Sequence, residues 1–119
     1  MSRHDIGVTL RQMRDFAVKA RTITTGRQQR DLQQDDTLRL ALERSLEVIG
    51  EAASRLPDDF KSRYPHIPWR QMIGMRNVLA HGYDVVRDEV LWDTATLNVP
   101  ELLQHLEIVL RDLDTSHDG

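Results

Sequence analysis

Four side chains that can do chemistry lie close together near the end of one predicted helix: Arg76, Asn77, His81 and Tyr83. Histidine can move a proton near neutral pH, and arginine can hold phosphate oxygens and stabilise charge in a transition state. On an ideal helix Arg76 and His81 lie about 140° apart around the axis and about 7.5 Å apart along it. Asn77 and His81 share a face, and the flexible Arg76 side chain can reach around towards a common anion. The set suits phosphodiester chemistry.

A purely structural interpretation of the same residues stays open. A histidine in the last turn before a glycine is a common helix end, stabilised by the helix dipole, and Arg76 can pair with Glu51 or Asp84. Tyr83 is more often a packed aromatic than a reactive one. From chemistry alone this interpretation is the stronger. The other histidines share no ligand spacing and the chain has no cysteine, so we predict no metal site.

Apolar residues repeat at helical spacing along most of the chain, which predicts an all-α, up-and-down bundle of four or five helices. Gly50 interrupts the longest predicted helix at a cost of about 1 kcal/mol, which indicates that another helix packs closely there. Pro68 suits the first turn of the helix that carries the motif. The predicted helices cover residues 5–24, 38–56, 58–64, 68–81 and 87–97, followed by a terminal helix that Pro100 starts or kinks, with a polar loop or frayed helix start over 26–36.

The net charge of −3 does not favour non-specific attraction to a nucleic-acid backbone, so any such contact needs a local patch. The first third of the chain is basic, and Arg11, Arg14, Lys19 and Arg21 are the candidates for a patch that faces a nucleic acid such as RNA. The 119 residues suit a single domain over 1–119. We find neither the apolar run of a signal peptide nor the length of a membrane span, so we expect a cytoplasmic protein without membrane contact.

One long segment of the chain resembles a known family. Residues 46–92, "LEVIGEAASRLPDDFKSRYPHIPWRQMIGMRNVLAHGYDVVRDEVLW", resemble the HepT-like family of HEPN proteins, the toxin halves of HEPN/MNT toxin–antitoxin pairs. Several features match together. They are "IGEA" in a long helix, "YPHIPW" before the next helix, the spacing of Arg, four residues, His, one residue and Tyr, and a tryptophan downstream.

The resemblance implies a homodimer in which the two motif helices meet in a cleft and form one composite, metal-independent endoribonuclease site without a cofactor. In such a site His81 acts as general base or acid, Arg76 binds the scissile phosphate, and Asn77 orients one of them. The resemblance also implies a cognate minimal nucleotidyltransferase (MNT) antitoxin, which transfers adenylyl groups from ATP to Tyr83. The added negative charge would repel RNA from the cleft.

A different class of function is a catalytically silent helical dimer that serves as a binding platform for a nucleotidyltransferase or for nucleotides. The net acidity of the chain slightly favours this platform, whereas the complete set of motif side chains favours the ribonuclease. Both alternatives predict a dimer. Apolar residues on the last helix and at Met75, Val78 and Leu79 offer more apolar surface than one small bundle covers.

Overall fold

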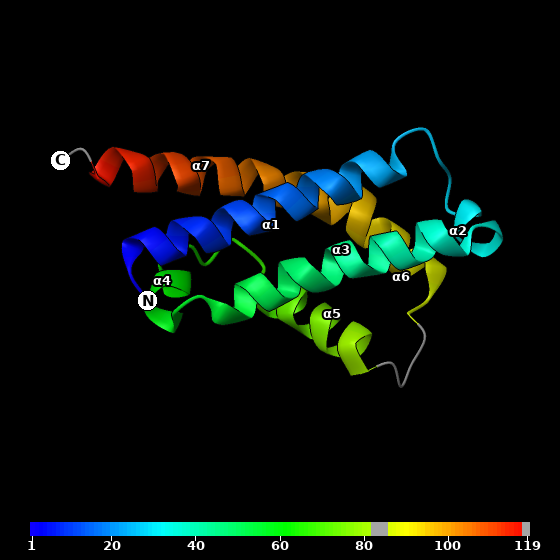
Figure 1. Ribbon diagram of the computed structural model, residues 1–119, viewed down its shortest axis with the longest axis horizontal. Coiled ribbons are helices and arrows are strands. Elements are labelled where there is room, and N and C mark those ends of the chain that lie inside the picture. Colours follow the sequence, from blue (N-terminus) through cyan, green and yellow to red (C-terminus); the bar gives the residue numbers. More distant parts are fainter. Residues whose placement is uncertain (82–85, 118–119) are drawn as a thin grey trace.

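The computed structural model describes residues 1–81 and 86–117, and over these residues it contains helices and no strand. The elements are α1 (Arg3–Thr24), α2 (Asp31–Gln34), α3 (Asp36–Arg55), α4 (Asp58–Ser62), α5 (Trp69–His81), α6 (Asp88–Asp93), the π-helix η1 (Thr94–Asn98) and α7 (Val99–His117). Helices α7, α1 and α3 run alongside one another, and α5 packs on the side of α3 away from α1 (Figure 1). The predicted all-α class is confirmed.

Helix α1 has a capped start, which extends it beyond the predicted first residue. The Ser2 hydroxyl accepts a hydrogen bond from the Asp5 N–H (3.1 Å), and the Asp5 carboxylate accepts one from the Ser2 N–H (3.3 Å). This reciprocal pair is a capping box, so the helix begins at Arg3 rather than at Asp5. At the other end α1 finishes at Thr24 as predicted, and Gly26 adopts a φ of 75° as the chain turns away.

The polar segment after α1 contains a short helix, α2, that its sequence pattern did not reveal. Leu32 of α2 is only 1% exposed and belongs to the core, although it is an isolated apolar residue among polar ones. A single apolar residue has no periodicity, so only its tertiary contacts identify it as buried. Helix α3 then begins at Asp36, because the Asp35 carboxylate accepts a hydrogen bond from the Leu38 N–H (3.1 Å).

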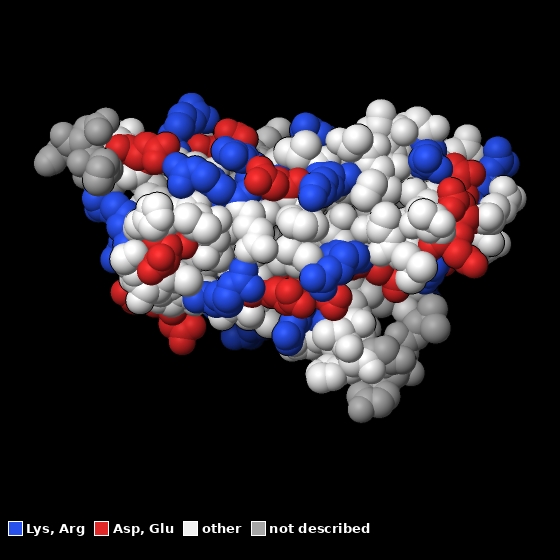
Figure 2. Space-filling model, in the orientation of Figure 1, with Lys and Arg blue, Asp and Glu red and all other residues white. Residues whose placement is uncertain are grey.

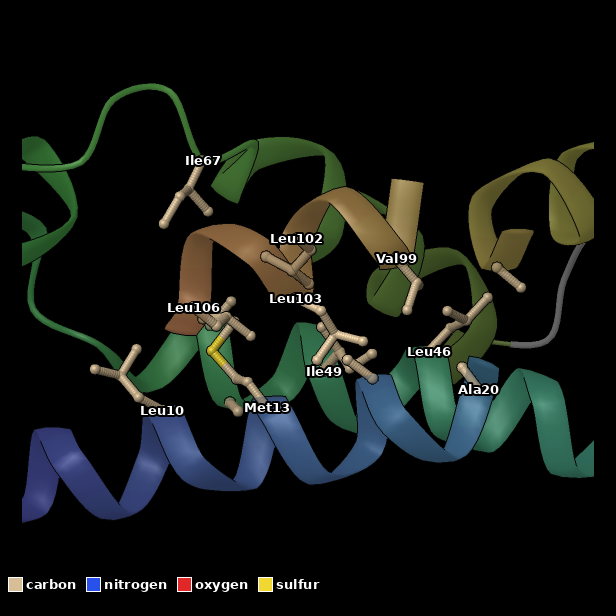
Figure 3. Packing of buried hydrophobic residues seen from close by; sticks show 14 of the residues in the cluster. Leu10, Met13, Ala20, Leu46, Ile49, Ile67, Val99, Leu102, Leu103 and Leu106 are labelled. Carbon is tan, nitrogen blue, oxygen red and sulfur yellow. The ribbon is translucent and has the colours of Figure 1, made fainter. Parts of the chain in front are cut away.

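The hydrophobic core lies where α1, α3 and α7 face one another (Figure 3). Leu10 and Met13 of α1 meet Ile49 of α3 and Leu106 of α7, and each of these side chains is at most 2% exposed. Burial of such side chains supplies the main stabilising free energy of the bundle. In the described part of the chain, none of the helices combines the length and the apolar character that crossing a membrane requires.

The C-terminal helices α6, η1 and α7 follow one another without a loop. The Val99 N–H donates to the Thr94 carbonyl, which is the wider spacing of a π-helix. This wide turn directly precedes Pro100, whose ring removes an N–H from the helix ladder. Pro100 was predicted to start or to kink the terminal helix, and it lies in the first turn of α7, which begins at Val99.

Candidate functional site

Helix α5, which carries the motif, is fixed at its first residue. The Trp69 side chain is buried, and its indole N–H donates to the carbonyl oxygens of Lys61 (3.1 Å) and Tyr64 (3.0 Å). The neighbouring Ile67 is 2% exposed in the core. These contacts join the start of α5 to the end of α4, so the orientation of α5 relative to α4 is fixed before the motif begins.

Gly50 sets the separation between α3 and α5. A Cβ at this position would meet the Cβ of Arg76 and would lie 2.5 Å from the Met72 carbonyl oxygen, which is closer than such atoms pack. Only a residue without a side chain lets the two helix backbones approach this closely. The prediction that Gly50 permits close helix packing is therefore confirmed. The side chain that packs against Gly50 is that of Arg76, which belongs to the motif.

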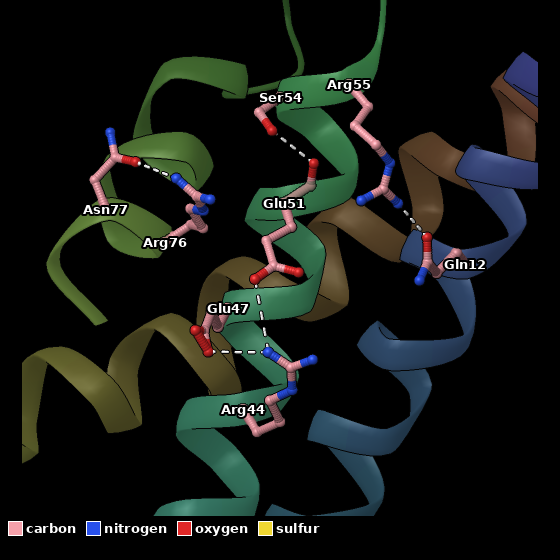
Figure 4. A network of polar contacts seen from close by, with 8 residues as sticks. All are labelled: Gln12, Arg44, Glu47, Glu51, Ser54, Arg55, Arg76 and Asn77. Carbon is pink, nitrogen blue, oxygen red and sulfur yellow. Dashed lines mark hydrogen bonds and ion pairs between the residues drawn. The ribbon is translucent and has the colours of Figure 1, made fainter. Parts of the chain in front are cut away.

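The Arg76 side chain lies between α5 and α3, and its guanidinium is turned towards Asn77 (Figure 4). Arg76 Nη1 donates to the Asn77 side-chain oxygen at 3.0 Å. Arg76 Nε is buried without a hydrogen-bond partner, and among the described side chains it is the only such atom. The suggested pairing of Arg76 with Glu51 is absent, because Glu51 instead faces Arg44 at 3.6 Å. Asp84, the other suggested partner, lies outside the described residues.

His81 is the last residue of α5 and its side chain is exposed. It follows Asn77 by four residues, so the two share a face of the helix. The Arg76 guanidinium contacts the Asn77 side chain on that helix face. That Arg76 and His81 reach a common anion stays a prediction. Tyr83 lies outside the described residues. In the described part of the chain, no group of three or more His, Asp or Glu side chains is placed to hold a metal ion.

The basic residues of α1 lie apart from the motif, since α1 and α5 pack on different sides of α3 (Figure 1). Arg11 pairs with Asp114 at 3.2 Å, Arg14 lies 3.6 Å from Asp15, and the Lys19 ammonium sits 4.2 Å from the centre of the Phe16 ring. Basic and acidic side chains alternate on the face shown in Figure 2. An RNA contact through Arg11, Arg14, Lys19 and Arg21 stays a prediction, on a surface separate from the motif.

An arginine that sequence reasoning missed holds the segment that follows the motif. Arg39 of α3 pairs with Asp88 and donates to the Val86 carbonyl oxygen. Hydrogen bonds to Asp88 from Arg39 and, to a smaller extent, from Gln33 lower the pKa of this carboxyl below its usual value. These contacts attach the chain on the far side of the motif to α3. No sequence signal marks Arg39, because its partners lie more than forty residues away.

The chain is related to a family of known proteins. The chain matches the HepT-like family, described as "Ribonuclease HepT-like", over residues 13–109. It is similar to "Putative RNase MJ1216" of Methanocaldococcus jannaschii, with 31% identity over 114 residues that cover 96% of this chain and 94% of the relative. It is also similar to "Probable ribonuclease HepT" of Thermococcus cleftensis, with 46% identity over 68 residues that cover 57% of this chain and 62% of the relative. No solved structure matches the chain.

The fold and the site together define a class: small helical bundles in which one helix ends with an arginine and a histidine five residues apart. The match over residues 13–109 identifies one family within that class. The chain belongs to the HepT-like ribonuclease family. The resemblance detected in residues 46–92 is thus confirmed at the level of the family.

Proposed function

We propose that this protein is a metal-independent endoribonuclease whose site is built from Arg76, Asn77 and His81. The observation that carries the proposal is the hydrogen bond from Arg76 Nη1 to the Asn77 side chain, because it holds a permanent positive charge beside a residue four positions before the exposed His81. The names of the relatives as ribonucleases support the same activity. A scaffold that only binds a partner has no chemical need for a titratable group beside a phosphate-binding one.

The proposed reaction uses the 2′-hydroxyl of RNA as its nucleophile. His81 removes the proton from this hydroxyl as the oxygen attacks the adjacent phosphorus, and the bond to the 5′-oxygen of the next nucleotide breaks. A protonated histidine returns a proton to that leaving oxygen. Arg76 holds the phosphate oxygens and stabilises the charge that develops on them. The products are a 2′,3′-cyclic phosphate and a 5′-hydroxyl, so protons balance without water or metal.

A second copy of the chain would complete this site. The outer side of α5 carries Met75 and Val78, with Val78 44% exposed, and a 410 Å³ groove separates these residues from Val90 of α6. An apolar groove beside exposed polar motif residues suits a symmetric contact with a second α5. Two His81 side chains across the twofold axis would divide the roles of base and acid.

The test of this proposal is cleavage of total cellular RNA by the purified native chain in EDTA. We expect cleavage, and we expect sedimentation of the same preparation to give a dimer. Mass spectrometry of the sample before the assay must show an unmodified chain, since a modified Tyr83 would hide the activity. An unmodified, folded chain that leaves RNA intact, both in EDTA and with added Mg²⁺, would contradict the ribonuclease and favour the binding platform.

We further propose that the protein is the toxin of a toxin–antitoxin pair and that an MNT antitoxin adenylylates Tyr83. Tyr83 follows the exposed His81 by two residues, so an adenylyl group there adds bulk and negative charge beside the RNA-binding groups. We expect incubation with the antitoxin and ATP to increase the intact mass by one or more adenylyl groups and to abolish cleavage. Tyr83→Phe is the control. If Tyr83→Phe shows the same increase in mass, the adenylyl group is attached to another residue. An unchanged mass of the native chain would mean that the antitoxin inhibits by binding alone.

A further inference from the structure

A second groove runs along the side of α5 that carries Asn77. It has a volume of about 780 Å³ and is bounded by α4, by the proline-rich link over residues 65–68 and by α5. Arg70 and Asn77 both line it, and so does Gly74 between them. The groove therefore ends at the proposed catalytic residues, since Asn77 holds the Arg76 guanidinium.

Arg70 supplies the available positive charge in this groove. The other cation, Lys61, is 15% exposed, donates to the Ala53 carbonyl oxygen at 3.3 Å and lies 3.8 Å from Asp58, so it is already engaged in the fold. The Arg70 side chain is exposed, and among the described residues it forms no hydrogen bond or ion pair. A guanidinium of this kind can bind phosphate without first losing another partner.

The spacing along α5 places Arg70 in line with the catalytic residues. Asn77 follows Arg70 by seven positions, so the two lie on nearly the same line of the helix, about 10.5 Å apart along its axis. Between them, the position of a Cβ on Gly74 has no neighbouring atom within 4 Å. A ribose–phosphate chain can therefore lie against the bare backbone at Gly74, with one phosphate at Arg70 and the chain leading past Asn77 towards Arg76, which lies beyond the groove lining.

We propose that this groove binds the single-stranded RNA next to the scissile bond and that Arg70 holds a flanking phosphate. The inference rests on the proposed ribonuclease function and assigns a path to its substrate, along α4 and α5 rather than across the basic residues of α1. Because Arg70 meets the RNA backbone and not a base edge, its contribution is independent of sequence. The contact matters for binding of the substrate and not for the chemical step at His81.

The test compares binding of a 2′-O-methylated oligoribonucleotide, which cannot be cleaved, with cleavage of the same sequence as unmodified RNA. We expect Arg70→Gln to weaken binding about tenfold at low salt and to reduce the slope of log K against log salt by about 0.7, the value of one phosphate contact on a single strand. We expect KM to rise with kcat nearly unchanged. Arg111→Gln makes the same charge change on the exposed surface of α7 and is the matched control.

The possible results distinguish failure of the RNA groove from failure of the ribonuclease activity. Binding and salt slope that are unchanged in Arg70→Gln, in a native chain that cleaves RNA, would overturn the groove and leave the ribonuclease intact. A loss of binding in Arg21→Gln but not in Arg70→Gln would overturn it also and place the RNA on α1. A loss of equal size in Arg111→Gln would show only a response to net charge. A native chain that neither binds nor cleaves RNA would remove the proposed function and this inference with it.

Discussion

Replacement of His81 by alanine is expected to lower the rate of RNA cleavage by about 10²–10⁴-fold, which is the usual contribution of a general acid or base. The histidine is exposed at the last position of α5, so its removal leaves no cavity in the core. We therefore expect near-native thermal unfolding together with the loss of activity. The measurement is the single-turnover rate of cleavage in EDTA, on chains whose circular dichroism and unmodified mass match those of the native protein.

Arg76→Lys, measured in the same assay, tests whether Arg76 holds the phosphate. Lysine keeps the positive charge and the aliphatic stem that packs against Gly50, but it loses the planar fork that donates to Asn77 and to phosphate together. A large loss of rate in Arg76→Lys with little change in stability would agree with a role in holding phosphate. If His81→Ala retained the full cleavage rate, His81 would not be the base or acid, and the proposed mechanism would be wrong.

The sequence predicted the parts of this fold that depend on local pattern. Pro57 and Pro68 marked the borders around α4 and α5, and the observed helices α3 and α5 end and begin within one or two residues of those prolines. Proline effects act over a few residues, so they are readable from a short window. The caps at Ser2 and Asp35 are equally local, but the predicted ranges began two residues after each observed helix start. The sequence did not reveal α2 or the π-helix η1, because those elements depend on tertiary packing and on the wide turn before Pro100.

Some features of the candidate site could likewise be predicted from the sequence, and others could not. The residue types of the motif are read directly from the sequence, and helix geometry places Asn77 and His81 on one face of α5. The groove beside Arg70 was not predicted, because α4 and the link over residues 65–68 form its other wall. Position along the chain does not tell which arginine has a partner. That difference separates Arg70 from Arg39, whose partners at Val86 and Asp88 lie far along the sequence.

Gly50→Ala is expected to destabilise the protein and to impair its activity in one step. The added methyl group meets the Met72 carbonyl oxygen and the Cβ of Arg76, and neither atom is the movable end of a side chain. The helices must therefore separate, at a cost of about 1–3 kcal/mol for overpacking, against which the better helix propensity of alanine offsets about 1 kcal/mol. Because Arg76 is itself one of the displaced residues, we expect its alignment with Asn77 and the rate of RNA cleavage to fall as well.

Gly74→Ala is the matched control for stability, on the same pair of helices. Within one chain a Cβ there has no neighbouring atom within 4 Å, so the same substitution should raise the unfolding free energy by about 0.5–1 kcal/mol through helix propensity. Urea unfolding of the two variants and the native chain at one protein concentration measures the difference, since dimerisation makes stability depend on concentration. Equal stabilisation by both alanines would mean that α3 and α5 do not approach closely at Gly50. If Gly50→Ala lowers the unfolding free energy and Gly74→Ala raises it, the absence of a methyl group at Gly50 sets the spacing of α3 and α5 that positions Arg76.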